Sequence, residues 1–353
     1  MKNSPFLFIL FFFPCLLQGQ SIRVSGIITT NTTWTQDTVY LTGDVFVANN
    51  VTLTVKAGTK VIALGRYKLD IKGALYAVGQ PNKFIKFSAI DTTNHFDTTS
   101  LSGWKGLHFE RIKTNNDSSI LQYCTVEFGR AVGLTYQERY GGGILIDSFS
   151  KLRIQNCQIV DNLAVVGGAG IQITNHSSPK ILNNFFKHNY AYVQGGAIAV
   201  TNNSPASIKY NMIVENAAFD LRETLGIPFG SGAGSAIYSS CLTDTTPIIM
   251  NNFIANNVGP SGNVYDSSPF TFIANNIIVN NYWSGIYNGH QRSYSIYANN
   301  TVCNNKFDSG ISSSSGYIYL YNNIIRGNET PSPRFAPNVQ LLSQVWHQAA
   351  WYS

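Results

Sequence analysis

The sequence predicts an all-β solenoid in which short parallel strands are wound into successive coils. The first observation is a frame that recurs eight times around an anchor residue. An aliphatic or aromatic residue stands three places before the anchor, and another stands two places after it. Self-similarity at a period of about 20–50 residues is typical of stacked repeat architectures. The six later anchors are all asparagine: Asn184, Asn211, Asn252, Asn276, Asn300 and Asn323.

The second observation is a Gly-led motif that keeps step with this frame, as in Gly168–Ile171 and Gly195–Ile198. Each copy therefore contains one short strand that follows glycine and another that ends near asparagine. The third observation is negative, because no stretch outside the N-terminus shows the apolar 3.6-residue period of helical repeats. We expect each coil to hydrogen-bond to the next at a spacing of about 4.8 Å, with equivalent side chains stacked in register.

The recurring asparagines are expected to be structural. A buried amide is costly unless its hydrogen bonds are satisfied, and in a stack each amide can bond to the asparagine above and below it. We therefore predict a ladder along the anchors. Glycine before the inward aliphatic residue suits a corner that needs positive φ or close backbone approach. A second asparagine stands five residues after most anchors: Asn162, Asn189, Asn216, Asn257, Asn281, Asn305 and Asn328.

The two earliest anchors are Cys124 and Cys157. On neighbouring coils their Cα atoms would lie about 5 Å apart, which is within disulfide range. Two interpretations stay open, a bridge in an oxidising compartment and two stacked buried thiols, and the second is preferred. Cys241 and Cys303 stand at unrelated places in the repeat and are expected to be unpaired. The four cysteines do not form a disulfide framework.

The chain divides into four predicted segments. An apolar run at Phe6–Leu17 follows Lys2 and is too short to span a bilayer, so residues 1–20 are predicted to be a secretory signal cleaved near Gly19 or Gln20. The alternative, a lipoprotein acylated at Cys15, is disfavoured because proline precedes that cysteine. Residues 21–113 are expected to form an N-terminal cap and the first coils, residues 114–328 the regular repeats, and residues 329–353 an atypical or truncated tail.

Composition limits the partners. Charged residues make up 12% of the chain, and the net charge of +6 is spread without a dense basic run or a basic helix. The sequence therefore lacks the electrostatic footprint of a nucleic-acid-binding protein. No second hydrophobic segment follows the signal, so the mature chain is expected to be secreted, extracellular or surface-held, without a transmembrane segment. The oligomeric state is not indicated by these features.

The repeats resemble a known group. Gly195–Ile198 matches the GGAI repeat, and Phe186–Asn189 and Phe253–Asn256 match the FxxN repeat, of chlamydial polymorphic outer-membrane proteins. More broadly, residues 30–330 resemble secreted bacterial right-handed parallel β-helix proteins, whose relatives include the pectate-lyase-like fold. The resemblance implies a right-handed, single-stranded parallel β-helix, and at about 25 residues per coil the repeats make about 12 coils. It also implies adhesion, which the polymorphic proteins perform.

Motifs for catalysis are absent from the sequence. Enzymes on this fold use paired carboxylates or a carboxylate cluster for Ca²⁺ with a basic residue. Here no Asp-Asp or Asp-x-Asp occurs, and the six histidines form no ligand pair at i, i+2 or i, i+4. We predict no cofactor and no metal. Because stacked coils can assemble a site from distant residues, a polysaccharide lyase or glycoside hydrolase with a dispersed site remains the main alternative.

Two features predict a binding surface. Insertions at Arg130–Tyr140 and Ala217–Gly232 project from the same corner, three coils apart, and could border a groove. Outward tyrosines on three successive Gly-led strands should form an exposed row of rings, although stacked tyrosines also stabilise a sheet by themselves. The candidate ligand-binding residues are Tyr136, Arg139, Tyr140, Phe219, Arg222, Phe229, Tyr238, Tyr265 and Tyr287.

The sequence thus favours a secreted or cell-surface module for binding or adhesion, without catalytic activity, that recognises a glycan or a surface partner. Three alternatives have different tests. A lyase or hydrolase requires carboxylates that converge on one face, a binding module requires aligned aromatic residues on an open face, and a spacer of a longer surface protein requires neither.

Overall fold

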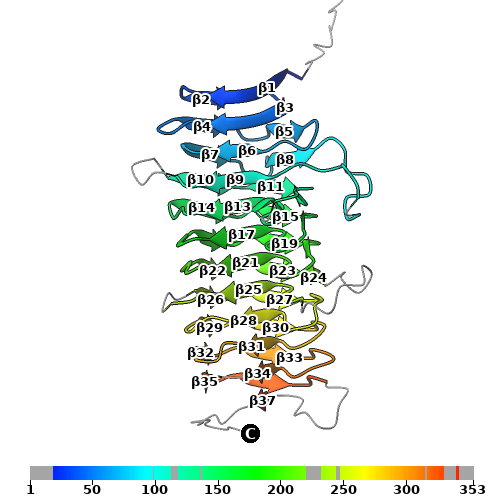
Figure 1. Cartoon of the computed structure of the whole chain (residues 1–353), viewed down its shortest axis with the longest axis vertical. Coiled ribbons are helices and arrows are strands. Elements are labelled where there is room, and N and C mark those ends of the chain that lie inside the picture. Colours follow the sequence, from blue (N-terminus) through cyan, green and yellow to red (C-terminus); the bar gives the residue numbers. More distant parts are fainter. Residues whose placement is uncertain are drawn as a thin grey trace, which may run out of the picture.

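The computed structural model describes residues 19–97, 99–112, 118–135, 137–219, 232–243, 247–314, 316–329 and 339–341. It is a tall stack of coils, with the N-terminal strands at one end and the C-terminal strands at the other (Figure 1). All strand-to-strand pairings between coils are parallel, as in β13 (Ile144–Asp147) with β17 (Ile171–Thr174). Of the predicted signal at 1–20, only residues 19 and 20 are described.

In the described part of the chain, three sheets run along the stack, with 22, 11 and 4 strands. The largest sheet contains two parallel columns of strands. The strands of the first, here called the Gly-led column, are β1 (Ser21–Ile28), β3 (Thr38–Val47), β6 (Leu69–Ile71), β9 (Leu107–Glu110), β13 (Ile144–Asp147), β17 (Ile171–Thr174), β21 (Ile198–Thr201), β25 (Ile237–Ser240), β28 (Val264–Asp266), β31 (Ile286–Asn288), β34 (Ile311–Ser313) and β37 (Val339–Leu341).

The second, here called the anchor column, begins with the first halves of β1 and β3. It continues through β5 (Lys60–Ala63), β8 (Ile85–Ala89), β11 (Cys124–Glu127), β15 (Gln158–Val160), β19 (Phe185–Lys187), β23 (Met212–Val214), β27 (Phe253–Ala255), β30 (Ile277–Val279), β33 (Thr301–Cys303) and β36 (Ile324–Arg326). The 22-stranded sheet therefore turns through two sides of every coil.

The other sheets close the coils. The 11-stranded sheet is β2 (Thr32–Trp34), β4 (Thr52–Val55), β7 (Ala74–Val78), β10 (Ser119–Gln122), β14 (Leu152–Gln155), β18 (Lys180–Leu182), β22 (Ser207–Lys209), β26 (Ile248–Met250), β29 (Phe272–Ala274), β32 (Tyr294–Ala298) and β35 (Tyr317–Tyr321). The 4-stranded corner sheet is β12 (Arg130–Ala131), β16 (Leu163–Ala164), β20 (Tyr190–Ala191) and β24 (Ala217–Ala218). A single 3₁₀ turn, η1 (Gln137–Arg139), appears among the described residues. The predicted all-β parallel solenoid is confirmed.

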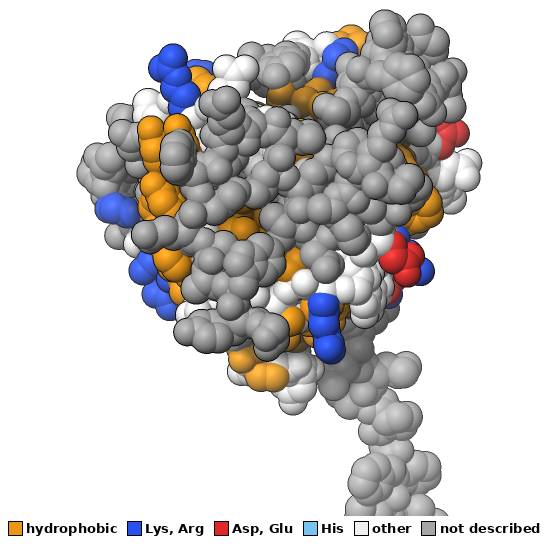
Figure 2. All heavy atoms as spheres, turned by 90° about the horizontal axis from the view of Figure 1, so that it is seen from below, with side chains coloured by type: hydrophobic (Ala, Val, Ile, Leu, Met, Phe, Trp, Pro, Cys, Tyr) orange, Lys and Arg blue, Asp and Glu red, His pale blue; other side chains and the backbone are white. Residues whose placement is uncertain are grey.

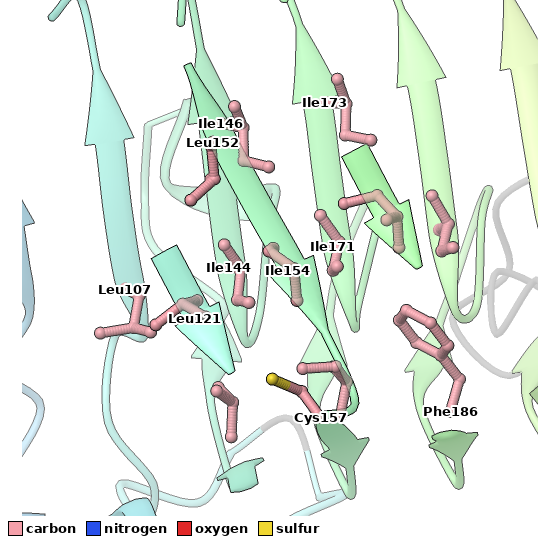
Figure 3. Packing of buried hydrophobic residues seen from close by; sticks show 14 of the residues in the cluster. Leu107, Leu121, Ile144, Ile146, Leu152, Ile154, Cys157, Ile171, Ile173 and Phe186 are labelled. Carbon is pink, nitrogen blue, oxygen red and sulfur yellow. The ribbon is translucent and has the colours of Figure 1, made fainter. Parts of the chain in front are cut away.

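The interior is filled by aliphatic side chains that repeat from coil to coil. Ile144 and Ile171 pair in register and are fully buried, and Ile154 from the facing sheet points into the same space (Figure 3). Burying one such side chain contributes roughly 1.5–3 kcal/mol. Alternation along each strand puts the neighbouring residues on the outer surface, so the inward isoleucines also fix which residues face solvent.

Hydrogen bonds between asparagines run the length of the regular coils. The Nδ2 of Asn184 donates to Oδ1 of Asn211 at 3.1 Å and to the carbonyl of Ile154 at 3.0 Å. The backbone N–H of Asn184 donates to the same Oδ1 at 2.9 Å. The ladder continues to Asn323, which accepts from Asn300 Nδ2 at 3.0 Å. Each interior amide thus uses both donors and both acceptor positions.

The structure adds backbone partners to the side-chain stacking expected from sequence. A second ladder joins the asparagines that stand five residues after the anchors, as in Asn189 Nδ2 to Asn216 Oδ1 at 2.9 Å. The anchor ladder also extends to cysteine, because Cys157 N–H donates to Asn184 Oδ1 at 2.9 Å. Cys124 and Cys157 are separate buried thiols, and burial raises the pKa of the Cys124 thiol well above its usual range.

Left-handed backbone explains why asparagines occur in pairs. The residue before the anchor has positive φ at Asn183 (54°), Asn251 (56°) and Asn275 (57°). Asparagine tolerates this region better than most residues. Glycine supplies it at the Gly-led corner, as at Gly195 (φ 63°). At Gly310 close approach matters instead, because a Cβ there would lie 2.5 Å from Nδ2 of Asn328.

The interior of the last coils contains a buried polar network beside its aliphatic side chains. Asp266 is fully buried, and its carboxyl group accepts hydrogen bonds from Thr271 Oγ1 (2.7 Å), Ser295 Oγ (2.7 Å) and Tyr297 Oη (2.8 Å). Burial raises the pKa of this carboxyl, and the hydrogen bonds oppose that shift. Neither the frame nor the composition predicted this network.

Among the described residues, no helix has the length and apolarity to cross a membrane.

The central anchor provides the first test. Replacing Asn211 by leucine removes the acceptor used by the N–H and Nδ2 of Asn184, and it removes the donor to Asn252. Unpaired buried groups of this kind cost about 1–3 kcal/mol each. Thermal and denaturant melts should show a lower midpoint for Asn211→Leu, while Lys209→Ala on the neighbouring strand should melt like the unmodified protein. Equal stability of the two variants would show that the asparagine ladder does not stabilise the fold.

Candidate functional site

The outer side of the Gly-led column carries one continuous row of registered residues. Successive Cα partners in this row are Asp70, His108, Leu145, Gln172, Ala199, Tyr238, Tyr265 and Tyr287. The chemistry changes along the row from charged, through amide and apolar, to aromatic. Because parallel strands lie about 4.8 Å apart, this face is a straight track along the axis of the stack.

The middle of this track is a groove with a volume of about 390 Å³. Its base includes Leu145 and Gln172, which expose only 7% and 1% of their surface. Most groups around it are amides and hydroxyls. The lining residues are Tyr140, Leu145, Asp147, Gln172, Thr174, Asn175, Gln194, Thr201, Asn202, Tyr238, Ser240 and Leu242.

The groove occupies the coils between the two predicted insertions. Its strands run from β13 to β25, which lie immediately after the insertions at 130–140 and 217–232. Tyr140, the last residue of the first insertion, lines the groove. Arg139 does not line it. The Arg139 guanidinium instead donates to the carbonyls of Gly133 (3.2 Å) and Leu134 (3.3 Å) within its own loop.

Three tyrosines extend the groove toward the C-terminus. The rings of Tyr238 and Tyr265 are stacked with centroids 5.3 Å apart, and those of Tyr265 and Tyr287 are 5.1 Å apart. The interplanar angles are 19° and 20°, so the rings are nearly parallel. Tyr238 also lines the groove. The row of rings is therefore continuous with the groove.

The three rings form the stacked row that the sequence predicts, but each ring is only partly exposed, less than expected. Each ring covers its neighbour, and the backbone lies close to the row. A Cβ on Gly289 would come within 2.6 Å of the Tyr265 hydroxyl oxygen. Burial is the main cause that raises the pKa of Tyr265 to about 12, so its hydroxyl is protonated at neutral pH.

A charged cluster lies at the other end of the groove. Asp70 is buried, and its oxygens contact Lys68 Nζ at 2.8 Å and Lys72 Nζ at 3.1 Å. On the next coil, His108 Nδ1 lies 2.8 Å from Glu110 Oε1, and His108 Nε2 lies 2.8 Å from a backbone carbonyl. Both ring nitrogens thus lie within hydrogen-bond distance of an oxygen atom.

The hydrogen bond from His108 is the first cause that lowers the pKa of Glu110 to about 2. Glu110 pairs in register with Asp147, so the two acidic residues occupy equivalent positions on neighbouring coils where the cluster meets the groove. Asp147 Oδ1 accepts hydrogen bonds from Asn175 Nδ2 at 2.8 Å and from Ser148 Oγ at 2.7 Å. The sequence does not show this pairing, because the two positions are 37 residues apart in the numbering.

Phe219, another predicted site residue, does not line the groove. Phe219 stacks on Tyr190 at the corner sheet, with ring centroids 6.2 Å apart. Tyr136, Arg222 and Phe229 lie outside the described residues.

A second cavity, of about 580 Å³, lies at this corner and is lined by Tyr190, Tyr192 and Phe96, the last from the loop at residues 91–100. The buried Arg130 holds the loop by donating to the carbonyls of Asp97 and Ser100. Burial, and then the charge of Arg130, lower the pKa of His95 to about 4, which leaves this imidazole neutral. The sequence does contain a signal for this loop contact, because Arg130 is the charged residue at a repeat position that is otherwise occupied by Leu163, Tyr190 and Ala217.

No group of three or more His, Cys, Asp or Glu side chains is arranged to hold a metal ion within the described part of the chain.

The fold now has a family assignment. The family described as right handed beta helix region matches residues 110–307, which is more than half of the chain, and the chain belongs to this family. No curated protein matches it. Among solved structures, a mutant of the periplasmic alginate epimerase AlgG is similar at 14% sequence identity, with 92% of this chain and 78% of that chain covered. The TM-score is 0.36, which is too low to carry an argument about function.

The charged cluster gives a pH-dependent prediction. The pKa of Glu110 is lowered from 4.5 to about 2, so its contribution to folding is present above about pH 4.5 and is lost as the pH falls toward 2. Denaturant melts from pH 6 to pH 2.5 should show that Glu110→Gln is less stable by on the order of 2 kcal/mol at pH 6. This difference should shrink below pH 4.5.

The matched control is Glu215→Gln, because Glu215 forms its ion pair with Lys187 at a more exposed position. Exposed pairs contribute little, so this variant should change stability less at every pH. A Glu110→Gln difference that stays constant down to pH 2.5 would show that the ionised Glu110 carboxylate does not stabilise the fold.

Proposed function

We propose that this protein is a secreted or cell-surface module that binds a glycan along the outer side of its Gly-led column. The observation that carries the proposal is the position of Tyr238, which lines the groove and begins the stacked row with Tyr265 and Tyr287. An elongated ligand could contact the polar groove and the aromatic row at once. The predicted signal at residues 1–20 supports export.

The chemistry of the face suits carbohydrate. Flat apolar rings with polar edges accommodate sugar rings, and the amides and hydroxyls of Gln172, Thr174, Asn175 and Thr201 can exchange hydrogen bonds with sugar hydroxyls. Rigidity adds to this. Because the strands of the face are fixed by pairing on both sides, little order must be gained on binding, which reduces the entropic cost.

A second candidate function is glycosidic bond cleavage, which the registered pair Glu110 and Asp147 favours. Retaining glycosidases hold two carboxyl groups about 5–5.5 Å apart, and neighbouring parallel strands are separated by about 4.8 Å. However, such enzymes also need a carboxylic acid that keeps its proton near neutral pH. The lowered pKa of Glu110 suits only the ionised partner, so binding is the preferred function.

A glycan array, followed by titration calorimetry with the best ligand, tests the proposal. Replacing Tyr265 by alanine removes the central ring of the row, and aromatic contacts of this kind contribute about 0.5–1.5 kcal/mol. We expect affinity to fall by about 2–12-fold. Tyr294→Ala is the control, because Tyr294 stacks on Tyr317 in the other sheet at a similar distance of 5.6 Å.

Thermal melts of both variants ensure that only folded protein is compared. The proposal fails if no glycan binds, or if the Tyr265 and Tyr294 variants lose affinity equally. An assay for reducing or unsaturated sugar ends, run on the same ligands, separates the two candidate functions. Ends released by the unmodified protein and not by a Glu110→Gln variant would establish cleavage.

A further inference from the structure

We infer that the groove selects uncharged glycans and disfavours acidic ones such as uronic-acid polymers, and that Asp147 sets this preference. This inference rests on the proposed function and specifies its ligand class. It comes from the distribution of charge around the groove and from the hydrogen-bonding groups that the groove offers.

The described residues that line the groove include a single carboxylate and no lysine or arginine. Of its twelve lining residues, only Asp147 carries a charge at neutral pH. The other polar groups are amides and hydroxyls. An acidic polymer would therefore bring its carboxylates beside a like charge in a partly desolvated site, where repulsion is stronger than in water.

The basic side chains described near the groove already have partners. Lys68 and Lys72 contact the carboxylate of Asp70. His108 directs one nitrogen at Glu110 and the other at the carbonyl of Lys105. The Arg139 guanidinium donates to carbonyls of its own loop. Recruiting any of these groups to an acidic ligand would leave a protein carboxylate or carbonyl without its partner.

The acceptors of the groove require donors. Asp147 Oδ1 receives two hydrogen bonds, from Asn175 and Ser148, whereas no described residue donates to Oδ2. Gln172 Nε2 donates to Thr201 Oγ1 at 2.9 Å and to the carbonyl of Ile173 at 3.3 Å, which fixes the orientation of the amide. Its buried Oε1 then lacks a partner. Sugar hydroxyls supply donors, and ionised carboxylates do not.

The test compares the unmodified protein, Asp147→Asn and a control, Asp161→Asn, on matched sets of uncharged and uronic-acid polymers. Asp161 lies on the turn after the anchor column, beside His188, and not in the groove. The unmodified protein should retain uncharged polymers at least tenfold better than acidic ones. Asp147→Asn should narrow that ratio by at least fivefold, and Asp161→Asn should leave it unchanged.

A measurement without any variant covers the case in which Asp147→Asn does not fold. Raising the salt concentration screens like charges, so the weak binding of acidic polymers to the unmodified protein should strengthen with salt. Binding of acidic polymers that equals or exceeds that of uncharged ones, or that weakens with salt, overturns the inference and leaves the proposed function intact. Failure to bind any polymer of either set overturns both.

Discussion

The hydrogen bonds that pass from each coil to the next hold this structure together. They include the backbone pairs of the parallel sheets and the two asparagine ladders, in which each amide is satisfied by equivalent groups above and below. A solenoid has no distant contacts to compensate for a poor interface between neighbours. The stability of every coil therefore depends on keeping the same residue type at the same place in the next.

The register imposed by these bonds also creates the candidate site. Once the inward isoleucines are stacked, the outward residues of the Gly-led column must form a straight row. Tyr238, Tyr265 and Tyr287 become a stack of rings only because their strands pair without a shift. The same register brings Glu110 beside Asp147. A displacement of one residue in a single strand would turn its outward side chains inward.

The face combines features with different consequences. Its aromatic end and its amide-rich centre offer contacts that suit an uncharged, hydroxyl-bearing chain. At the charged end, the carboxyl groups of Asp70 and Glu110 already contact Lys68, Lys72 and His108. Elsewhere, Lys and Arg side chains are scattered around the C-terminal end of the molecule instead of forming one patch (Figure 2). The net positive charge of +6 is therefore not gathered into one basic patch on the part of this end that the structure describes.

Local patterns determined the fold. Repeated anchors such as Asn184 and Asn211, with the Gly-led motif, specify parallel coils because each coil makes the same contacts as its neighbour. The candidate site was only partly foreseeable. The alignment of the tyrosines follows from the repeat, but their partial burial depends on how closely Gly289 and the adjoining backbone pack against them. Other contacts join residues that are distant in sequence. Glu110 pairs with Asp147, and Arg130 holds the loop that contains Asp97 and Ser100. Their contacts depend on how the irregular insertions and corners fold back onto the coils, which a repeat does not encode and only the tertiary structure decides.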